Sequence, residues 1–258
     1  MDILVCVKRV PDPSENDIRL NRQGNDIEKD DLVYSVNEWD NYAVEEAIQI
    51  VDKIGGSVTV ASVGSEEEEE VLRRQMAMGA NKGVLLSDAM TQQADGRKIA
   101  RFLSSYVSQN KFDLILCGAQ SDEGASQVGG MMAALLDRPY ASLVNMIEVV
   151  SDSKLKIGRE IEGGNQEINE IEMPCVLSIQ TGINEPRYVS IRGIRKVASL
   201  EIPALSASDI GCEDCGLRLQ KLEYFQPEMG AGAEMLAGNT EEMAEKVAEM
   251  LKAKGGIR

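Results

Sequence analysis

The residues best suited to chemistry lie in CGAQSDEGASQVGGMMAALL, which runs from Cys117 to Leu136. An apolar, strand-like segment leads there through a polar, glycine-rich loop into a helix-like segment. Free backbone N–H groups at a helix start attract anions, and glycines let the backbone approach a ligand closely. Asp122, Ser126 and Gln127 offer hydrogen bonds to a sugar or base. The loop has neither a P-loop GK[ST] nor a G-x-G-x-x-G fingerprint, so a nucleotide site and an ordinary strand-to-helix connection both stay open.

A second candidate is the basic segment INEPRYVSIRGIRK, residues 183–196, in a chain of net charge -16. It gathers Arg187, Arg192, Arg195 and Lys196 around Ile191. The overall charge argues against nucleic-acid binding, which needs an excess of Lys and Arg. The cations would therefore meet an acidic protein partner or simply face water, and the residues alone leave both interpretations open.

The histidine and cysteine content narrows the chemistry further. The chain has no histidine, which excludes Ser-His-Asp and Cys-His nucleophiles and His-ligated metals. Cys6, Cys117 and Cys175 lie in or beside apolar runs and are expected to be reduced core residues. Cys212 and Cys215 form a C-x-x-C pair without the further ligands that a metal site needs, so no metal is predicted.

The elements that must position these residues alternate along the first part of the chain. Strand-like apolar runs occur at 3–10, 57–64, 83–88 and 112–119, and helix-like segments at 42–51, 71–80 and 96–110. Asn37 lies where a helix cap can form, and Ser65 precedes a glutamate run typical of a first helical turn. This alternation predicts an α/β fold with a doubly wound, mostly parallel sheet in flavodoxin-like or Rossmann-like layers.

From about residue 145 the apolar pattern changes to a period of two. Segments 145–150, 154–162, 166–173 and 174–180 are predicted to add antiparallel strands at a sheet edge, with a turn at Gly163 and Gly164. After Pro203 the pattern weakens until a helix over 239–256, where Asn239 and Glu242 have capping-box spacing. We predict a nucleotide-binding α/β domain over 1–200, including the edge hairpins and segment 183–196, and a C-terminal arm over 201–258.

The chain carries no pattern of a membrane or secreted protein. Its apolar runs fall short of the roughly 18 residues that a membrane span needs. The N-terminus MDILVCVKRV enters a strand-like run without a basic leader and a cleavage pattern. We therefore expect a cytoplasmic protein with no direct membrane insertion.

Several motifs occur in order along nearly the whole chain: ILVCVKRVPD, SVNEWDNYAVEEAI, MAMGANKGV, LILCGAQSDEGASQVGGMMAALL, REIEGG, MPCVLSIQ and INEPRYVSIRGIRK. Together they resemble the β subunit of electron transfer flavoprotein. The resemblance implies a heterodimer with an α subunit that mainly holds the redox-active FAD, while this subunit buries AMP. It also implies an electron carrier without catalytic residues of its own, which takes electrons from a flavin-dependent dehydrogenase to a quinone-linked or other acceptor.

The same resemblance assigns site residues. For AMP these are Cys6, Asn37, Glu38, Trp39, Asp40, Val63, Gly118, Ala119, Gln120, Ser121, Asp122, Glu123, Gly124, Ala125, Ser126, Gln127 and Val128. For docking of the dehydrogenase they are Arg187, Tyr188, Arg192, Arg195 and Lys196, with Ile191 as the apolar anchor. Glu160 in REIEGG matches an acid that holds the mobile flavin domain by an ion pair to the α subunit. In the loop, Asp122 and Glu123 would repel a phosphate, so a ribose or base is expected beside them and the phosphate nearer the glycines.

Two alternatives accompany this interpretation. A bifurcating member of the family would hold a second FAD in place of AMP, although such members tend to have proline where this chain has Gly130. A stand-alone nucleotide-binding sensor of the universal-stress type shares the α/β core. It would not need REIEGG, the docking segment or a C-terminal arm.

Overall fold

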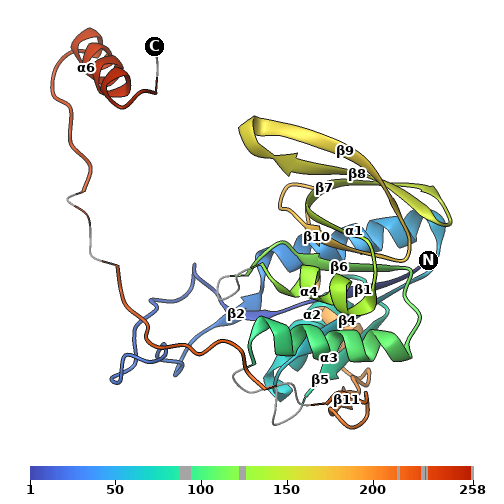
Figure 1. Ribbon diagram of the computed structural model, residues 1–258. Helices are drawn as coiled ribbons and strands as arrows, with labels where there is room; N and C mark the ends of the chain where they lie inside the picture. The colour runs from blue at the N-terminus through green and yellow to red at the C-terminus, as the bar shows by residue number, and fades with distance from the viewer. Residues whose placement is uncertain (88–93, 122–125, 214–215, 228–229, 231, 257–258) are drawn as a thin grey trace. The chain divides into compact units, whose positions relative to one another are not determined.

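A computed structural model describes residues 1–87, 94–121, 126–213, 216–227, 230 and 232–256 of the chain (Figure 1). The chain divides into two compact units: Met1–Ile18 with Glu28–Lys221, and Arg19–Ile27 with Leu222–Arg258. The first unit extends past residue 200, where the sequence predicts a boundary, because a short strand beyond it still pairs with the main sheet.

The first unit is built on one large sheet. Its strands and those of a small ribbon are β1 (Asp2–Cys6), β2 (Arg9–Pro11), β3 (Tyr34–Val36), β4 (Ser57–Val63), β5 (Lys82–Leu86), β6 (Leu114–Gly118), β7 (Tyr140–Ser151), β8 (Lys154–Ile161), β9 (Asn165–Glu172), β10 (Cys175–Ile179) and β11 (Ala204–Leu205). The helices of the chain are α1 (Glu38–Ile54), α2 (Glu69–Met78), α3 (Gly96–Gln109), α4 (Val128–Leu136), α5 (Ile191–Val197) and α6 (Thr240–Ala253).

The strand order in the sheet is β11-β5-β4-β1-β6-β10-β7-β8-β9. Neighbouring strands from β11 to β7 pair in parallel, and β7, β8 and β9 pair antiparallel. The predicted α/β fold with a mostly parallel sheet is confirmed. A separate antiparallel ribbon joins β2 to β3.

Helices cover both faces of the sheet, as the buried clusters show. One cluster joins Ile3 and Val5 to the apolar faces of α1 and α2, and the other joins Leu4 and Cys6 to α3 and α4. Alternate residues of β1 therefore face opposite layers, and both are buried. Such strands appear in sequence as continuous apolar runs because neither face meets water.

The prediction for residues 174–180 is wrong in one respect. β10 is not an antiparallel edge strand: it lies inside the sheet, parallel to both β6 and β7. All five of its residues are buried, so its short apolar run fits a central strand, which periodicity alone does not distinguish from an edge strand. The three preceding segments do form antiparallel strands, and Gly163 and Gly164, with φ of 79° and 71°, turn the chain between β8 and β9.

The second unit ends in α6, whose start is built as predicted. Asn239 Oδ1 accepts from Glu242 N–H at 3.0 Å, and a Glu242 carboxylate oxygen accepts from Asn239 N–H at 3.2 Å. None of the side chains of α6 is buried within this chain, and Val247, Met250 and Leu251 are 42%, 41% and 43% exposed. Among the described residues, the helices are too short or too polar to cross a membrane.

Candidate functional site

The candidate site lies at the carboxyl ends of β1 and β6, where the chain order of the sheet reverses. The order runs outward from β1 through β4 and β5 on one side, and through β6 and β10 on the other. In open α/β sheets a crevice forms outside the carboxyl ends at such a switch point, because the connections leave in opposite directions. The loops after β1 and β6 and the first turn of α1 border this crevice.

Asp40, in the first turn of α1, ties the two strand ends together. One carboxylate oxygen accepts from Lys8 N–H at 2.8 Å, and the other accepts from Gly118 N–H at 3.0 Å. The residue is 5% exposed, and burial raises the pKa of Asp40 to about 7, although these hydrogen bonds and that from Asn37 act to lower it. Asp40 is thus a buried acceptor that fixes the crevice walls.

Asn37 lies at the N-cap position of α1, but its side chain makes no capping hydrogen bond. Instead, Nδ2 donates to the carbonyl oxygen of Gln120 at 2.8 Å, which holds the loop after β6 against α1. The prediction of a side-chain cap at Asn37 is wrong for this reason. Asn37 Oδ1 is buried and has no hydrogen-bond partner among the described residues, so the crevice wall contains an unsatisfied acceptor.

Gly118 is required by the close approach of α1 to β6. A Cβ atom on this residue would lie 2.4 Å from Asp40 Oδ1 and 2.6 Å from Trp39 Cβ. Gly129, near the start of α4, is similarly confined, because its Cβ would lie 2.7 Å from Ser178 Oγ and 2.8 Å from Cys117 Sγ. Gly118, at the end of β6, and Gly129, in the first turn of α4, therefore allow close packing around the crevice.

A cavity of about 510 Å³ opens beside this crevice. It is lined by Trp39, Ala119, Gln120, Ser126, Tyr140, Ser142, Leu143, Gln180 and Thr181. The first four belong to the predicted nucleotide site, so the fold does bring them together. A volume of roughly 300–1,000 Å³ is typical of small-molecule sites.

The amino end of α4 also faces the loop that carries these residues. The helix begins at Val128, and the residue at its N-cap, Gln127, makes no side-chain capping bond. The first N–H groups of a helix carry partial positive charge and lack partners within the helix, which suits them to an anion. Nearby, Lys8 Nζ donates to Ser121 Oγ at 3.4 Å and places a cation at the crevice.

Gln180, which the sequence interpretation missed, connects the cavity to Glu160. Its Oε1 accepts from Trp39 Nε1 at 3.1 Å, and its Nε2 donates to a Glu160 carboxylate oxygen at 3.0 Å. Residues that follow a parallel strand lie at the same sheet edge as the loop after β6. Recognising β10 as parallel would have indicated Gln180 and Thr181.

The other predicted residues lie around this centre. Cys6 is buried, its Sγ lies 3.9 Å from Met132 Sδ, and burial raises the pKa of the thiol. Val63 ends β4 and packs on the same buried cluster, whereas Glu38 is exposed. Residues 122–125, which include Asp122, Glu123, Gly124 and Ala125, lie outside the described residues, as does Cys215.

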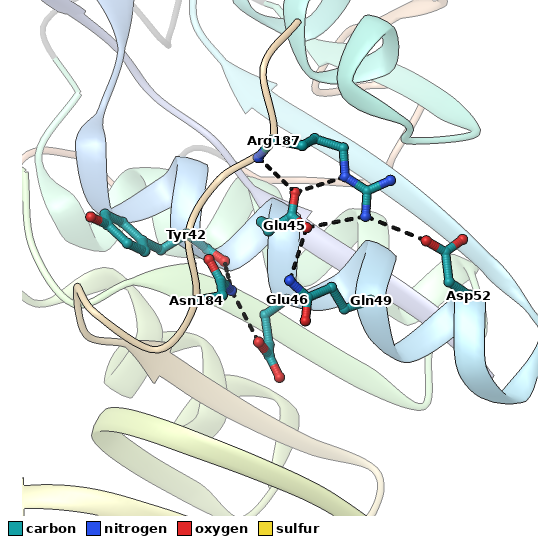
Figure 2. A network of polar contacts seen from close by, with 7 residues as sticks. All are labelled: Tyr42, Glu45, Glu46, Gln49, Asp52, Asn184 and Arg187. Carbon is teal, nitrogen blue, oxygen red and sulfur yellow. Dashed lines mark hydrogen bonds and ion pairs between the residues drawn. The ribbon is translucent and has the colours of Figure 1, made fainter.

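The basic segment forms the short helix α5 and the strand-like stretch before it. Ile191 opens the helix and is 68% exposed, and Tyr188 is 89% exposed. Arg192, Arg195 and Lys196 are exposed as well. Arg187 differs from them, because its guanidinium binds the carboxylates of Glu45 and Asp52 on α1 (Figure 2).

Comparison with known proteins agrees with this architecture. Residues 26–210 match the electron transfer flavoprotein domain. That match covers most of the chain and defines its class.

Relatives that align with the chain over their full length identify the subunit as well as the family. The chain is 34% identical over 262 residues to electron transfer flavoprotein subunit beta of Methylophilus methylotrophus, covering 97% of this chain and 98% of that protein. It is 31% identical over 261 residues to the subunit of the same name in Bacillus subtilis, with 100% of both covered. It is also 34% identical to the caffeyl-CoA reductase-Etf complex subunit CarD of Acetobacterium woodii, over 98% of this chain and 99% of that protein. The chain therefore belongs to the electron transfer flavoprotein family, as a β subunit.

Membership of this family assigns electron transfer as the broad function and implies association with a flavin. It also separates the chain from universal-stress-type sensors, because its relatives align with it over their full length as β subunits.

Proposed function

We propose that this subunit holds AMP as a structural ligand in the crevice at the ends of β1 and β6. The carrying observation is that Trp39, Ala119, Gln120 and Ser126 line one cavity of suitable size beside the uncapped start of α4. The N–H groups at that helix start would hold the phosphate, and the polar side chains of the cavity would hold the ribose and base. The unsatisfied Asn37 Oδ1 and the narrow fit at Gly118 are consistent with a wall shaped for a ligand.

In this proposal the α subunit is the partner that mainly holds the FAD, and FAD supplies the redox chemistry. The β subunit contributes no catalytic residue: it orders the nucleotide crevice and presents surfaces to other proteins. Glu160 forms an ion pair with the α subunit that holds the mobile flavin domain. Its hydrogen bond to Gln180, which also binds Trp39, supports a fixed orientation for that carboxylate.

A flavin-dependent dehydrogenase docks on α5 and the residues before it. Ile191 is the apolar anchor: it is 68% exposed, and Ile194, one turn along the same helix, is 50% exposed, and grouped exposed apolar side chains mark interaction sites. Tyr188, Arg192, Arg195 and Lys196 surround it, and the cations steer an acidic partner surface. The FAD of the complex would supply electron transfer from this dehydrogenase to a quinone-linked or other acceptor, and the complex would work in the cytoplasm.

The test is to identify the nucleotides released when the co-expressed two-subunit complex is denatured, by chromatography and mass spectrometry. One FAD and one AMP per heterodimer are expected. Two FAD would contradict the AMP assignment and support the bifurcating alternative. A complex with one FAD and no second nucleotide would contradict both.

A further inference from the structure

The segment that leads into α5 is fastened to α1 by a polar network (Figure 2). Asn184 Nδ2 donates to the carbonyl oxygen of Tyr42 at 3.1 Å and to a Glu46 carboxylate oxygen at 3.0 Å. Arg187 donates to Glu45 three times: from its backbone N–H at 3.1 Å, from Nε at 2.8 Å and from Nη2 at 3.1 Å. Both ends of this short stretch are therefore bound to one helix.

The charge of Arg187 is balanced inside the molecule. Its Nη2 also lies 3.3 Å from Asp52 Oδ2, so one guanidinium faces two carboxylates. The Glu45 side chain is only 4% exposed. Burial by itself raises the pKa of Glu45, but hydrogen bonds from Arg187 and Gln49 bring it below its usual value. In contrast, no ion pair involves Arg192, Arg195 or Lys196 within the part of the chain that the structure describes.

The middle of α5 rests directly on α2. A Cβ atom on Gly193 would lie 2.8 Å from the carbonyl oxygen of Ala77, so only glycine allows this approach without a backbone shift. Ser190 is the N-cap of α5, and its Oγ accepts from Gly193 N–H at 3.0 Å. The Ser190 side chain thus fixes where α5 starts, and Gly193 allows the close contact of α5 with α2.

Arg73 of α2 closes the other end of α5. Its Nη1 donates to the carbonyl oxygens of Val197, Ala198 and Leu200 at 2.9, 3.2 and 3.0 Å. Glu69, one turn earlier on α2, pairs with the same guanidinium. The last carbonyl groups of a helix lack partners within it, and a cation there is favoured by the helix dipole.

We propose that Arg187, Gly193 and Arg73 form a three-point clamp that holds α5 on α1 and α2, and that Arg187 is a positioning residue and not a steering charge. The existence of the clamp does not depend on the proposed docking role of Ile191. Only the effect of the clamp on electron transfer rests on that role. It keeps Ile191 in one orientation before the dehydrogenase arrives, which reduces the entropy lost on docking. The steering charge is left to Arg192, Arg195 and Lys196.

The experiment uses the complete two-subunit complex, with Arg187→Ala and Gly193→Ala as clamp variants. Hydrogen exchange of residues 190–197 reports on the clamp without any dehydrogenase. Kinetics with a flavin-dependent dehydrogenase as electron donor, at several ionic strengths, give KM, kcat and the salt dependence of kcat/KM. Arg192→Ala is the steering control. Gly230→Ala is the glycine control, because a Cβ there would meet no atom of the described residues within 4 Å.

With either clamp variant, exchange in 190–197 should rise by about tenfold or more, since the local opening becomes easier. KM should rise several-fold with kcat little changed, and the salt dependence should stay that of the wild type. Arg192→Ala should do the reverse: unchanged exchange and a weaker salt dependence. Arg187→Lys should restore little, because a lysine cannot reproduce the forked contact with Glu45.

Unchanged exchange in both clamp variants would overturn the proposal. A weaker salt dependence in Arg187→Ala, or full recovery with Arg187→Lys, would overturn the positioning role in favour of steering. Ile191→Ala separates the two levels: if it leaves KM unchanged, the docking assignment fails, and the exchange result still decides whether the clamp exists.

Discussion

The crevice at the carboxyl ends of β1 and β6 and the α5 region are both held by acidic residues of α1, but in different environments. In the crevice, Asp40 is buried and accepts from backbone N–H groups of two strands. Beside α5, Glu45 and Asp52 share one half-exposed arginine, and Asp52 is 62% exposed. A buried acceptor has no water to replace it, and this holds for Glu45 as well, whose side chain is 4% exposed. Its partner Arg187 and the second acid Asp52 are exposed to solvent, so their ion pair competes with water and salt. The crevice should therefore govern stability, and α5 should govern encounters with partners.

The strongest way to break this comparison is to remove one acid from each region. Asp40→Ala should destabilise the complex by about 3–5 kcal/mol, because it leaves two buried backbone donors without an acceptor. Asp52→Ala, the matched control on the same helix, should cost no more than about 1 kcal/mol. Urea denaturation of the two-subunit complex measures both. Equal losses would show that burial does not separate the two regions.

The pH dependence of stability gives a second test of the crevice. The pKa of Asp40 is about 7 in the folded protein, against 3.8 ordinarily, so the folded state binds the extra proton between these values. Stability should therefore fall as pH rises from about 4 to 7, with a slope of up to about 1.4 kcal/mol per pH unit from this group.

Asp40→Asn removes the titrating group, so its stability should lack this part of the slope. The measurement is urea denaturation at several pH values, with Asp52→Asn as the matched variant on the same helix. A wild-type slope in Asp40→Asn would mean that other groups are responsible.

Substitutions of two glycines near the crevice test how closely its walls must pack. Gly118→Ala should cost about 1–3 kcal/mol and lower the nucleotide content, because its Cβ would overlap Asp40 Oδ1. Gly130→Ala is the matched control, since its Cβ would lie 3.6 Å from Tyr140, at ordinary contact distance. Thermal unfolding and nucleotide analysis report the result. Normal nucleotide content in Gly118→Ala would weaken the assignment of the crevice.

The smallest effect on stability is expected at the exposed anchor. Ile191→Ala should leave the unfolding midpoint and nucleotide content unchanged, because the side chain is 68% exposed. Burial of an isoleucine in a partner contributes roughly 1.5–3 kcal/mol, so KM in the dehydrogenase assay should rise about tenfold. An unaltered KM would remove Ile191 from the docking surface.

Much of the fold and part of the site could be predicted from local sequence. The predicted antiparallel strands at β7, β8 and β9 and the α6 capping box are confirmed, because alternating burial and caps depend on neighbours in sequence. Trp39, Ala119, Gln120 and Ser126 line one cavity, and their role in binding a nucleotide stays a prediction. Glu160 and Gln180 meet only because β8 and β10 join the same sheet.

The sequence by itself determined the α/β class, from periodicity, and the family, from motifs. The nucleotide and docking residues, which the family resemblance assigns, stay predictions. Only the tertiary structure decided which partner each polar side chain contacts. Asp40 became a bridge between strand ends, Asn37 turned from its helix to the loop after β6, and β10 entered the sheet centre. Arg187, one cation among several in the sequence, became bound to α1. Such partners come from distant parts of the chain, so only the packed fold selects them.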